Sequence, residues 1–210
     1  MKALLIKDYC ILIREVKQML LVPVVFTVMA VVTKQLVWIL WPVFFISLLP
    51  YTINSYEEQS NWPLYAETMP YGRKRIVYEK YAMMLINGMI MTLILSAVTA
   101  SILLLKGSFD FAAMWQMIVL IIAGAILPGC LMLPMMFKYG NAKGRVMYLI
   151  VLAMFGGLMG AMGTASKDAK FYELLQYGHN MNFTVLLLGV LIVFFLSVRL
   201  SVHFYEKRDI

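Results

Sequence analysis

Charged side chains are scarce in this sequence. Asp, Glu, Lys and Arg make up 14% of its residues, whereas hydrophobic residues make up 62% and the mean hydropathy is +0.82. A typical soluble domain is about 25% charged and about 45–50% apolar. A soluble globule could not hide this much apolar surface from water, so the composition predicts an integral membrane protein.

Cysteine and histidine are also rare. The two cysteines are Cys10, in a basic amino-terminal region, and Cys130, in an apolar run. Neither lies in a metal-ligand motif, and we expect two free thiols because the two regions belong at different depths of a membrane. The two histidines, His179 and His203, fall on opposite faces of the predicted protein. The sequence therefore predicts no metal site, and no serine has a histidine and a carboxylate arranged to activate it.

Nucleotide-binding and ion-coupling motifs are missing as well. The glycine-rich run at residues 156–163 lies in an apolar stretch and lacks the Gly-Lys-Ser/Thr ending of a phosphate-binding loop. The middles of the apolar runs contain no Asp, Glu, Lys or Arg, whereas ion-coupled carriers commonly bind their ion at such a residue. We predict a chain that is not an enzyme and binds no cofactor. Energy for any active transport would then come from a partner.

Continuous apolar runs occupy most of the chain. Backbone groups in hydrocarbon must be satisfied within the protein, which leaves helices or closed barrels, and barrel strands would alternate polar with apolar residues. The sequence therefore predicts an all-α fold, with each run judged against the roughly 20 residues that cross a bilayer. The six predicted transmembrane helices cover residues 18–32, 36–56, 77–105, 111–137, 146–165 and 183–203.

Three further segments complete this single transmembrane domain of residues 1–210. In residues 1–17, apolar residues recur at helical spacing among charged ones, which predicts an amphipathic helix at the membrane interface. Residues 57–76 form a polar connection between the second and third spans. Residues 166–182 form the largest connection on the opposite face.

Positive charge is distributed unevenly between the two predicted faces. Fourteen Lys and Arg residues fall on the face that carries the termini, and four fall on the other. Because cytoplasmic segments are enriched in Lys and Arg, we predict that both termini and residues 57–76 are cytoplasmic and that residues 166–182 are extracellular. The net charge of +7 is thus a topology signal and does not indicate nucleic acid binding.

The connection at residues 57–76 carries the most specific pattern, because it combines acidic and aromatic side chains with a basic run. An aromatic side chain can anchor in a pocket of a partner while neighbouring carboxylates face basic residues there. We therefore predict a partner-binding segment, and a helix resting on lipid headgroups is the competing interpretation. The predicted contact residues are Glu57, Glu58, Asn61, Trp62, Tyr65, Glu67 and Arg73.

This segment resembles that of the small permease subunits of type-2 ABC exporters. Those subunits have a basic amphipathic amino-terminal helix, six spans and a cytoplasmic segment with a Leu-Pro-x-Ser-Arg-like break and an Ile-Val-x-x-Lys-Tyr entry into the third span. The matching positions here are Met69, Pro70, Arg73, Ile76, Val77, Lys80 and Tyr81. Tyr71 and Gly72 depart from the usual pair of an aliphatic residue and serine.

The resemblance implies a partnership with a separate ATPase. Residues 57–68 would be a coupling helix that docks into a groove on a cytoplasmic ABC ATPase, of which two copies would bind ATP and Mg²⁺. A second copy of the chain would complete a homodimer in the cytoplasmic membrane of a bacterium. Spans one, two and five would line the path.

The cargo is predicted from the walls of that path. The spans are rich in aromatic residues, and the 18 methionines of the chain suit adaptable apolar surfaces. The subunits that this chain resembles include exporters of phenol-soluble modulins, which are amphipathic peptides, so we expect amphipathic peptides or other hydrophobic cargo. Two other classes stay open: an ion-coupled carrier or channel, and a non-transporting immunity or regulatory subunit. Transport without any ATPase would favour the carrier or channel.

Overall fold

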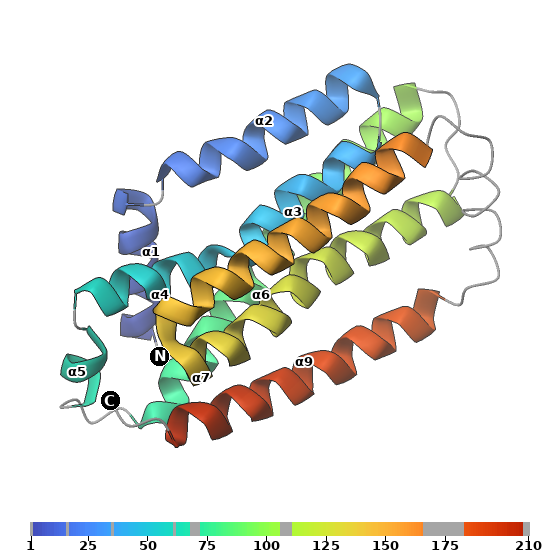
Figure 1. Ribbon diagram of the computed structural model, residues 1–210. Coiled ribbons are helices and arrows are strands. Elements are labelled where there is room, and N and C mark those ends of the chain that lie inside the picture. Colours follow the sequence, from blue (N-terminus) through green and yellow to red (C-terminus); the bar gives the residue numbers. More distant parts are fainter. Residues whose placement is uncertain are drawn as a thin grey trace.

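The computed structural model describes residues 2–15, 17–34, 36–60, 62–67, 72–105, 111–165 and 183–207. Its elements are α1 (Lys2–Glu15), α2 (Lys17–Thr33), the 3₁₀ helix η1 (Leu36–Ile39), α3 (Leu40–Ser47), α4 (Leu49–Gln59), α5 (Trp62–Glu67), α6 (Arg73–Leu105), α7 (Phe111–Ala165) and α9 (Phe183–Glu206). No strand occurs in these ranges, so the all-α prediction is confirmed. Figure 1 shows a bundle of long helices, with α1, α5 and the end of α9 at one end of it.

Three helical stretches within the described residues are long and apolar enough to cross a membrane. They are Lys74–Leu105, Met114–Gly140 and Val185–Glu206, and a fourth arises if α1 and α2, bent by 72°, count as one span. The other predicted spans are also occupied by helices, but their crossing of a bilayer stays a prediction. The predicted extracellular loop at residues 166–182 lies outside the described residues.

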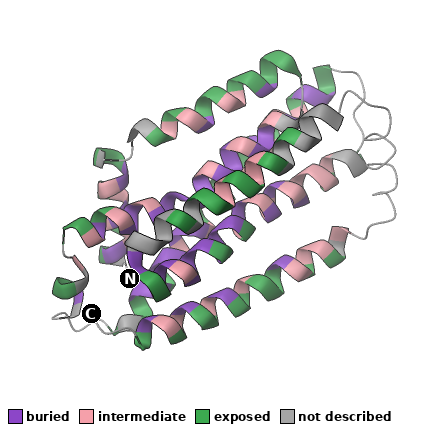
Figure 2. Ribbon diagram, in the orientation of Figure 1, coloured by how far each residue is buried: buried purple, intermediate pink, exposed green. Residues whose placement is uncertain are grey.

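Apolar side chains cover much of the outside of the bundle. Val24 and Val28 of α2, and Ile192 and Phe195 of α9, are all more than half exposed. Figure 2 shows exposed residues along the outer faces of both helices. In water, an exposed apolar surface of this extent would promote aggregation. Hydrocarbon is the solvent that this surface fits.

The second predicted span is not a single straight helix. It is divided into η1, α3 and α4, and α4 begins at Leu49 with Pro50 in its first turn. Proline has no backbone N–H with which to continue the hydrogen-bond ladder of α3, but the first turn of a new helix tolerates it. Because α4 then continues to Gln59, it includes Glu57 and Glu58, which the sequence had assigned to the coupling segment.

A single glycine reverses the chain inside α7. Gly140 has φ 69° and ψ −178°, a left-handed conformation that only a residue without Cβ adopts readily. Figure 1 shows the two halves of α7 side by side and antiparallel. These halves coincide with the predicted spans at 111–137 and 146–165, and the loop expected between them is reduced to a tight turn.

Gly129 allows α7 to approach its neighbours closely. A Cβ at this position would overlap the sulfur of Met84 on α6 and would lie 3.3 Å from the carbonyl oxygen of Ser47. The flexible side chain of Met84 can shift, but the Ser47 carbonyl belongs to the backbone and limits the space for a new Cβ. We therefore expect Gly129→Ala to lower the free energy of unfolding by about 1–3 kcal/mol through overpacking.

The midpoint of thermal unfolding in detergent measures this effect. The matched control is Gly189→Ala in α9, where a Cβ meets nothing within 4 Å and where alanine should stabilise the helix by about 0.5–1 kcal/mol. Equal midpoints for the two variants would contradict the close approach at Gly129.

Candidate functional site

One stripe of α1 packs against the bundle. Leu4, Asp8 and Leu12 follow one another at intervals of one helical turn, and none is more than 6% exposed. Leu12 belongs to a core cluster with Ile53 of α4 and Met83 of α6. This packing carries the carboxylate of Asp8 into the interior, between α4 and α6.

Four charged side chains from three helices form a closed ring, which we call the ion ring. Its members are Lys7 and Asp8 of α1, Glu57 of α4 and Lys80 of α6. Lys80 Nζ lies 2.6 Å from Asp8 Oδ2 and 2.9 Å from Glu57 Oε2. Lys7 Nζ lies 3.2 Å from Asp8 Oδ1 and also pairs with Glu57 Oε1. Each lysine therefore bridges both carboxylates, and the two positive charges balance the two negative ones.

Protein shields the ion ring from solvent. Asp8 and Lys80 are fully buried, Glu57 is 3% exposed and Lys7 is the most accessible member at 23%. An isolated charge in such a place is very unfavourable, and it is tolerated only with well-placed partners. Each member of the ring therefore depends on the others, and the ring fixes the placement of α1, α4 and α6 relative to one another.

Lys7 also connects the ion ring to α5. Its Nζ lies 4.1 Å from the centroid of the Trp62 ring, in a cation–π contact. Trp62 packs in turn against Tyr65, with ring centroids 5.5 Å apart. At the end of α4, Ser60 Oγ donates a hydrogen bond of 2.9 Å to the carbonyl of Glu57. The short helix α5 is thus attached to α1 and α4.

An apolar surface of α5 points away from these contacts. Leu64 is 55% exposed and Tyr65 is 57% exposed, whereas Ala66 on the other side of the helix is buried. Tyr56, near the end of α4, is also exposed. We call Tyr56, Leu64 and Tyr65 the α5 surface.

The predicted partner-contact residues separate into different environments. Glu57 faces inward and binds two lysines of its own chain, and its contact with a partner stays a prediction. Trp62 is half-buried under Lys7, Glu58 is half-buried in α4 and Tyr65 belongs to the α5 surface. The side chains that lie outside the described part of the chain are those of Asn61, Glu67 and Arg73.

A second polar cluster begins one residue after Lys80. The hydroxyl of Tyr81 lies 2.6 Å from Ser197 Oγ and 2.8 Å from Ser201 Oγ, both on α9. Ser197 Oγ donates to the carbonyl of Cys130 on α7 at 2.7 Å. The start of α6 is therefore joined on one side to α1 and α4, and on the other to α7 and α9.

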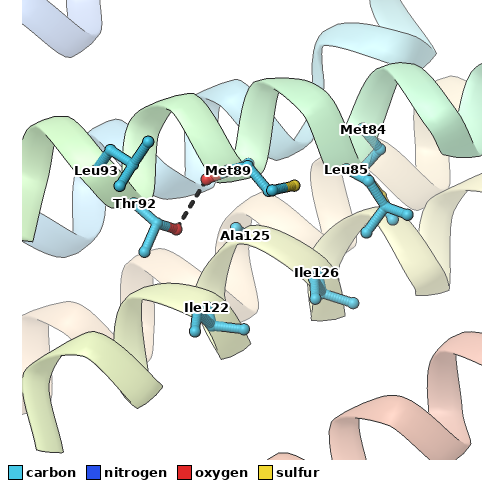
Figure 3. A pocket seen from close by; sticks show the side chains of 9 residues that line it. Met84, Leu85, Met89, Thr92, Leu93, Ile122, Ala125 and Ile126 are labelled. Carbon is cyan, nitrogen blue, oxygen red and sulfur yellow. Dashed lines mark hydrogen bonds between the residues drawn. The ribbon is translucent and has the colours of Figure 1, made fainter. Parts of the chain in front are cut away.

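Two apolar pockets lie farther along the bundle. The first, of about 290 Å³, is between α6 and α7, and Figure 3 shows side chains from both helices around it, including Met89 and Ile122. Thr92 contributes a hydroxyl, but this hydroxyl donates to the carbonyl of Gly88 at 2.8 Å. The second, of about 300 Å³, lies between α3 and α7 and is lined in part by Phe155. Both pockets suit apolar groups rather than polar ligands.

The ion ring was missed at the level of sequence, where Lys7 was interpreted as a topology signal and Lys80 as a topology signal and a position of the family motif. A signal was present, because Asp8 stands in register with Leu4 and Leu12 on an apolar helical stripe. A charge in that position must be buried together with a counter-charge. Among the described residues, no group of three or more His, Cys, Asp or Glu side chains is placed to hold a metal ion.

The chain is a multi-pass membrane protein, helical throughout its described elements, with a buried charged cluster at one end of its bundle. Residues 3–206 match the model of a family described as ABC-2 family transporter protein, and the chain belongs to this family. It is therefore a permease component of an ABC transporter, a transport subunit that works with an ATPase partner. No curated protein and no solved structure matches the chain.

Proposed function

We propose that this chain is the permease half of an ATP-driven exporter, in which the α5 surface docks onto a separate ABC ATPase. The observation that carries the proposal is the contact of Lys7 with both Trp62 and Glu57. Through it, a displacement of α5 is passed to α1 and then, by way of Lys80, to α6. ATP and Mg²⁺ are bound by two copies of the ATPase, and this chain supplies no residue to the hydrolysis.

The proposed topology has six spans. They are α2, the segment from η1 to α4, α6, the two halves of α7, and α9, with α1 and α5 at the cytoplasmic face of a bacterial cell membrane. Its support is the gathering of charge at one end of the bundle, where the ion ring lies and where Lys74 pairs with Glu206 at 3.3 Å. The positive-inside rule assigns that end to the cytoplasm.

A second, identical copy completes the path in this proposal, and α2, α3 and the second half of α7 form its walls. Aromatic packing among these elements supports that choice. Phe26 and Trp41 stack with centroids 5.3 Å apart, and Trp41 meets Phe155 edge-on at 6.2 Å. Aromatic and apolar walls suit amphipathic peptides or other hydrophobic cargo, since they offer few hydrogen-bonding groups.

Co-purification with candidate ABC ATPase subunits tests the docking. The wild-type chain should form a complex of two permeases with two ATPases. Leu64→Asp changes an exposed side chain of α5, and Tyr65→Ala also removes the packing of Tyr65 on Trp62. Each should weaken the complex by about 30-fold, which corresponds to the roughly 2 kcal/mol of an interface hot spot. The control is Lys74→Gln, an exposed residue at the same end of the bundle whose surface ion pair contributes little.

Undiminished binding by both α5 variants would remove the docking assignment.

Reconstitution in liposomes distinguishes an exporter from a carrier or channel and from a regulatory or immunity subunit. Movement of cargo by the chain without an ATPase would identify a carrier or channel, and a stable complex that moves no cargo would identify a regulatory or immunity subunit.

A further inference from the structure

One stripe of α9 faces away from the rest of the bundle. Its exposed side chains, three or four residues apart, are those of Leu188, Ile192, Phe195 and Arg199. Ser197, whose hydroxyl donates to a carbonyl of α7, lies on the opposite side of the helix from Arg199. We call this surface the α9 stripe. It is apolar along most of its length and ends in a cation.

The depth of Arg199 in a membrane follows from the length of the span. Val185–Glu206 has 22 residues, which corresponds to about 33 Å of helix against about 30 Å of hydrocarbon. Arg199 lies about two turns before Glu206, and therefore near the level at which acyl chains meet headgroups. From Leu188 to Arg199 the helix rises about 16 Å, which is roughly half of the hydrocarbon thickness and thus the reach of one acyl chain.

The structure gives Arg199 no counter-charge. In the part of the chain that it describes, no side chain forms a salt bridge or a hydrogen bond with the Arg199 guanidinium. Glu206, the acidic residue of α9, pairs with Lys74 at 3.3 Å. An arginine at this depth is unfavourable unless it reaches an anion or extends to the interface. The anion that this position requires is available in lipid headgroups.

A second cation lies beside α9 at the same end of the stripe. Lys138 Nζ is 4.8 Å from the ring centroid of Tyr139 and 5.0 Å from that of Phe204. Tyr139 is 44% exposed, and tyrosine is enriched at membrane–water interfaces. Phe204 follows Arg199 by about 7.5 Å along the helix axis. Two positive charges at this level favour a headgroup with a net negative charge over a zwitterionic one.

We propose that the α9 stripe binds an anionic phospholipid. The guanidinium of Arg199 donates paired hydrogen bonds to phosphate oxygens, because its planar fork matches their geometry. One acyl chain lies along Phe195, Ile192 and Leu188. A second copy of the chain fits this surface less well, since the same face would meet itself in a two-fold dimer and bring two unpaired arginines together.

Lipid binding to the purified full-length chain in detergent tests the proposal. It needs no ATPase, so its result does not depend on the proposed function. Phosphatidylglycerol and phosphatidylcholine are titrated separately, and bound lipid is measured by native mass spectrometry. The wild type should bind phosphatidylglycerol about 10-fold more tightly, as expected for charge-assisted hydrogen bonds. Arg199→Gln should lose this preference, and Arg199→Lys should retain part of it.

Arg75→Gln is the matched control. Arg75 is also exposed, and it lies in the first turn of α6 beside Lys74, whose partner is Glu206 of α9. Its loss should lower the affinity for phosphatidylglycerol by no more than about twofold, because a solvated charge is screened. Without lipid, Arg199→Gln should unfold at the same temperature as the wild type, since its guanidinium has no side-chain partner to lose.

Equal affinity of the wild type for the two lipids would overturn the proposal, as would an undiminished preference in Arg199→Gln. Equal losses in Arg199→Gln and Arg75→Gln would contradict it too, because they would indicate diffuse attraction without a site. Displacement of phosphatidylglycerol by an equal concentration of inorganic phosphate would exclude a role for the acyl chain. A smaller oligomer in Arg199→Gln would assign this face to a second copy of the chain and reject the lipid.

Discussion

Lys80→Met should lower the free energy of unfolding by about 3–5 kcal/mol, the usual cost of removing one partner from a buried ion pair. Methionine is close to lysine in length and fills the same space, so the loss would come from charge and not from a cavity. Lys80 is fully buried and lies within 3 Å of oxygens of both Asp8 and Glu57. Without it, Lys7 alone would face two buried carboxylates.

The midpoint of thermal unfolding in detergent is the measurement for this prediction. Lys74→Met is the matched control, because the same substitution there removes an exposed ion pair with Glu206 and should cost no more than about 1 kcal/mol. Adding Glu57→Gln to Lys80→Met should recover part of the stability, since it removes one uncompensated charge. If Lys80→Met proved as stable as Lys74→Met, the ion ring would have no structural role.

The second large effect concerns transport. In the proposed exporter, Lys7→Met should leave the ATPase complex intact but reduce transport about 10- to 30-fold, because a shielded cation–π contact is worth up to about 2 kcal/mol. The substitution removes the contacts of Lys7 with Trp62, Glu57 and Asp8 but changes no residue of the α5 surface. Movement of the docked ATPase would then no longer be passed from α5 to α1.

Transport by reconstituted wild-type and variant complexes checks this expectation. Lys7→Arg is the matched variant and should retain most of the transport, since a guanidinium also stacks on an aromatic ring and pairs with carboxylates. Full transport by Lys7→Met would contradict a coupling role. Failure of Lys7→Met to assemble with the ATPase would instead place Lys7 in the docking surface.

Helix positions were predictable from the sequence because they depend on local apolar runs. The predicted segments at 183–203 and 77–105 fall within α9 and α6, whose length and hydropathy are properties of consecutive residues. The positions at which these helices break or turn were harder to predict. The effect of Pro50 depends on whether a helix starts or continues at that point, and the turn at Gly140 depends on a backbone angle that glycine permits but does not require.

The partner-binding segment was located from its aromatic and acidic composition, but the ion ring was not. Its members are separated by up to 73 positions, from Lys7 to Lys80, and only packing of the helices brings them together. Helical spacing did contain a partial signal for Lys80, which lies one turn after Ile76 and one turn before Met84 on the buried side of α6. That spacing predicts burial, but it does not identify the counter-charges.

The polar contacts between helices give the two ends of the bundle different resistance to spreading. The ion ring, the cluster around Tyr81 and the hydrogen bond from Tyr9 to Asn87 all hold the end near α1 together. Toward the other end, the described core includes Ile102 and Ile121, which make apolar contacts. Lipid tails can replace such contacts at little cost. Helices that separate at that other end lose few favourable interactions. A movement that starts at the end near α1 would therefore separate the helices most at the opposite end of the bundle.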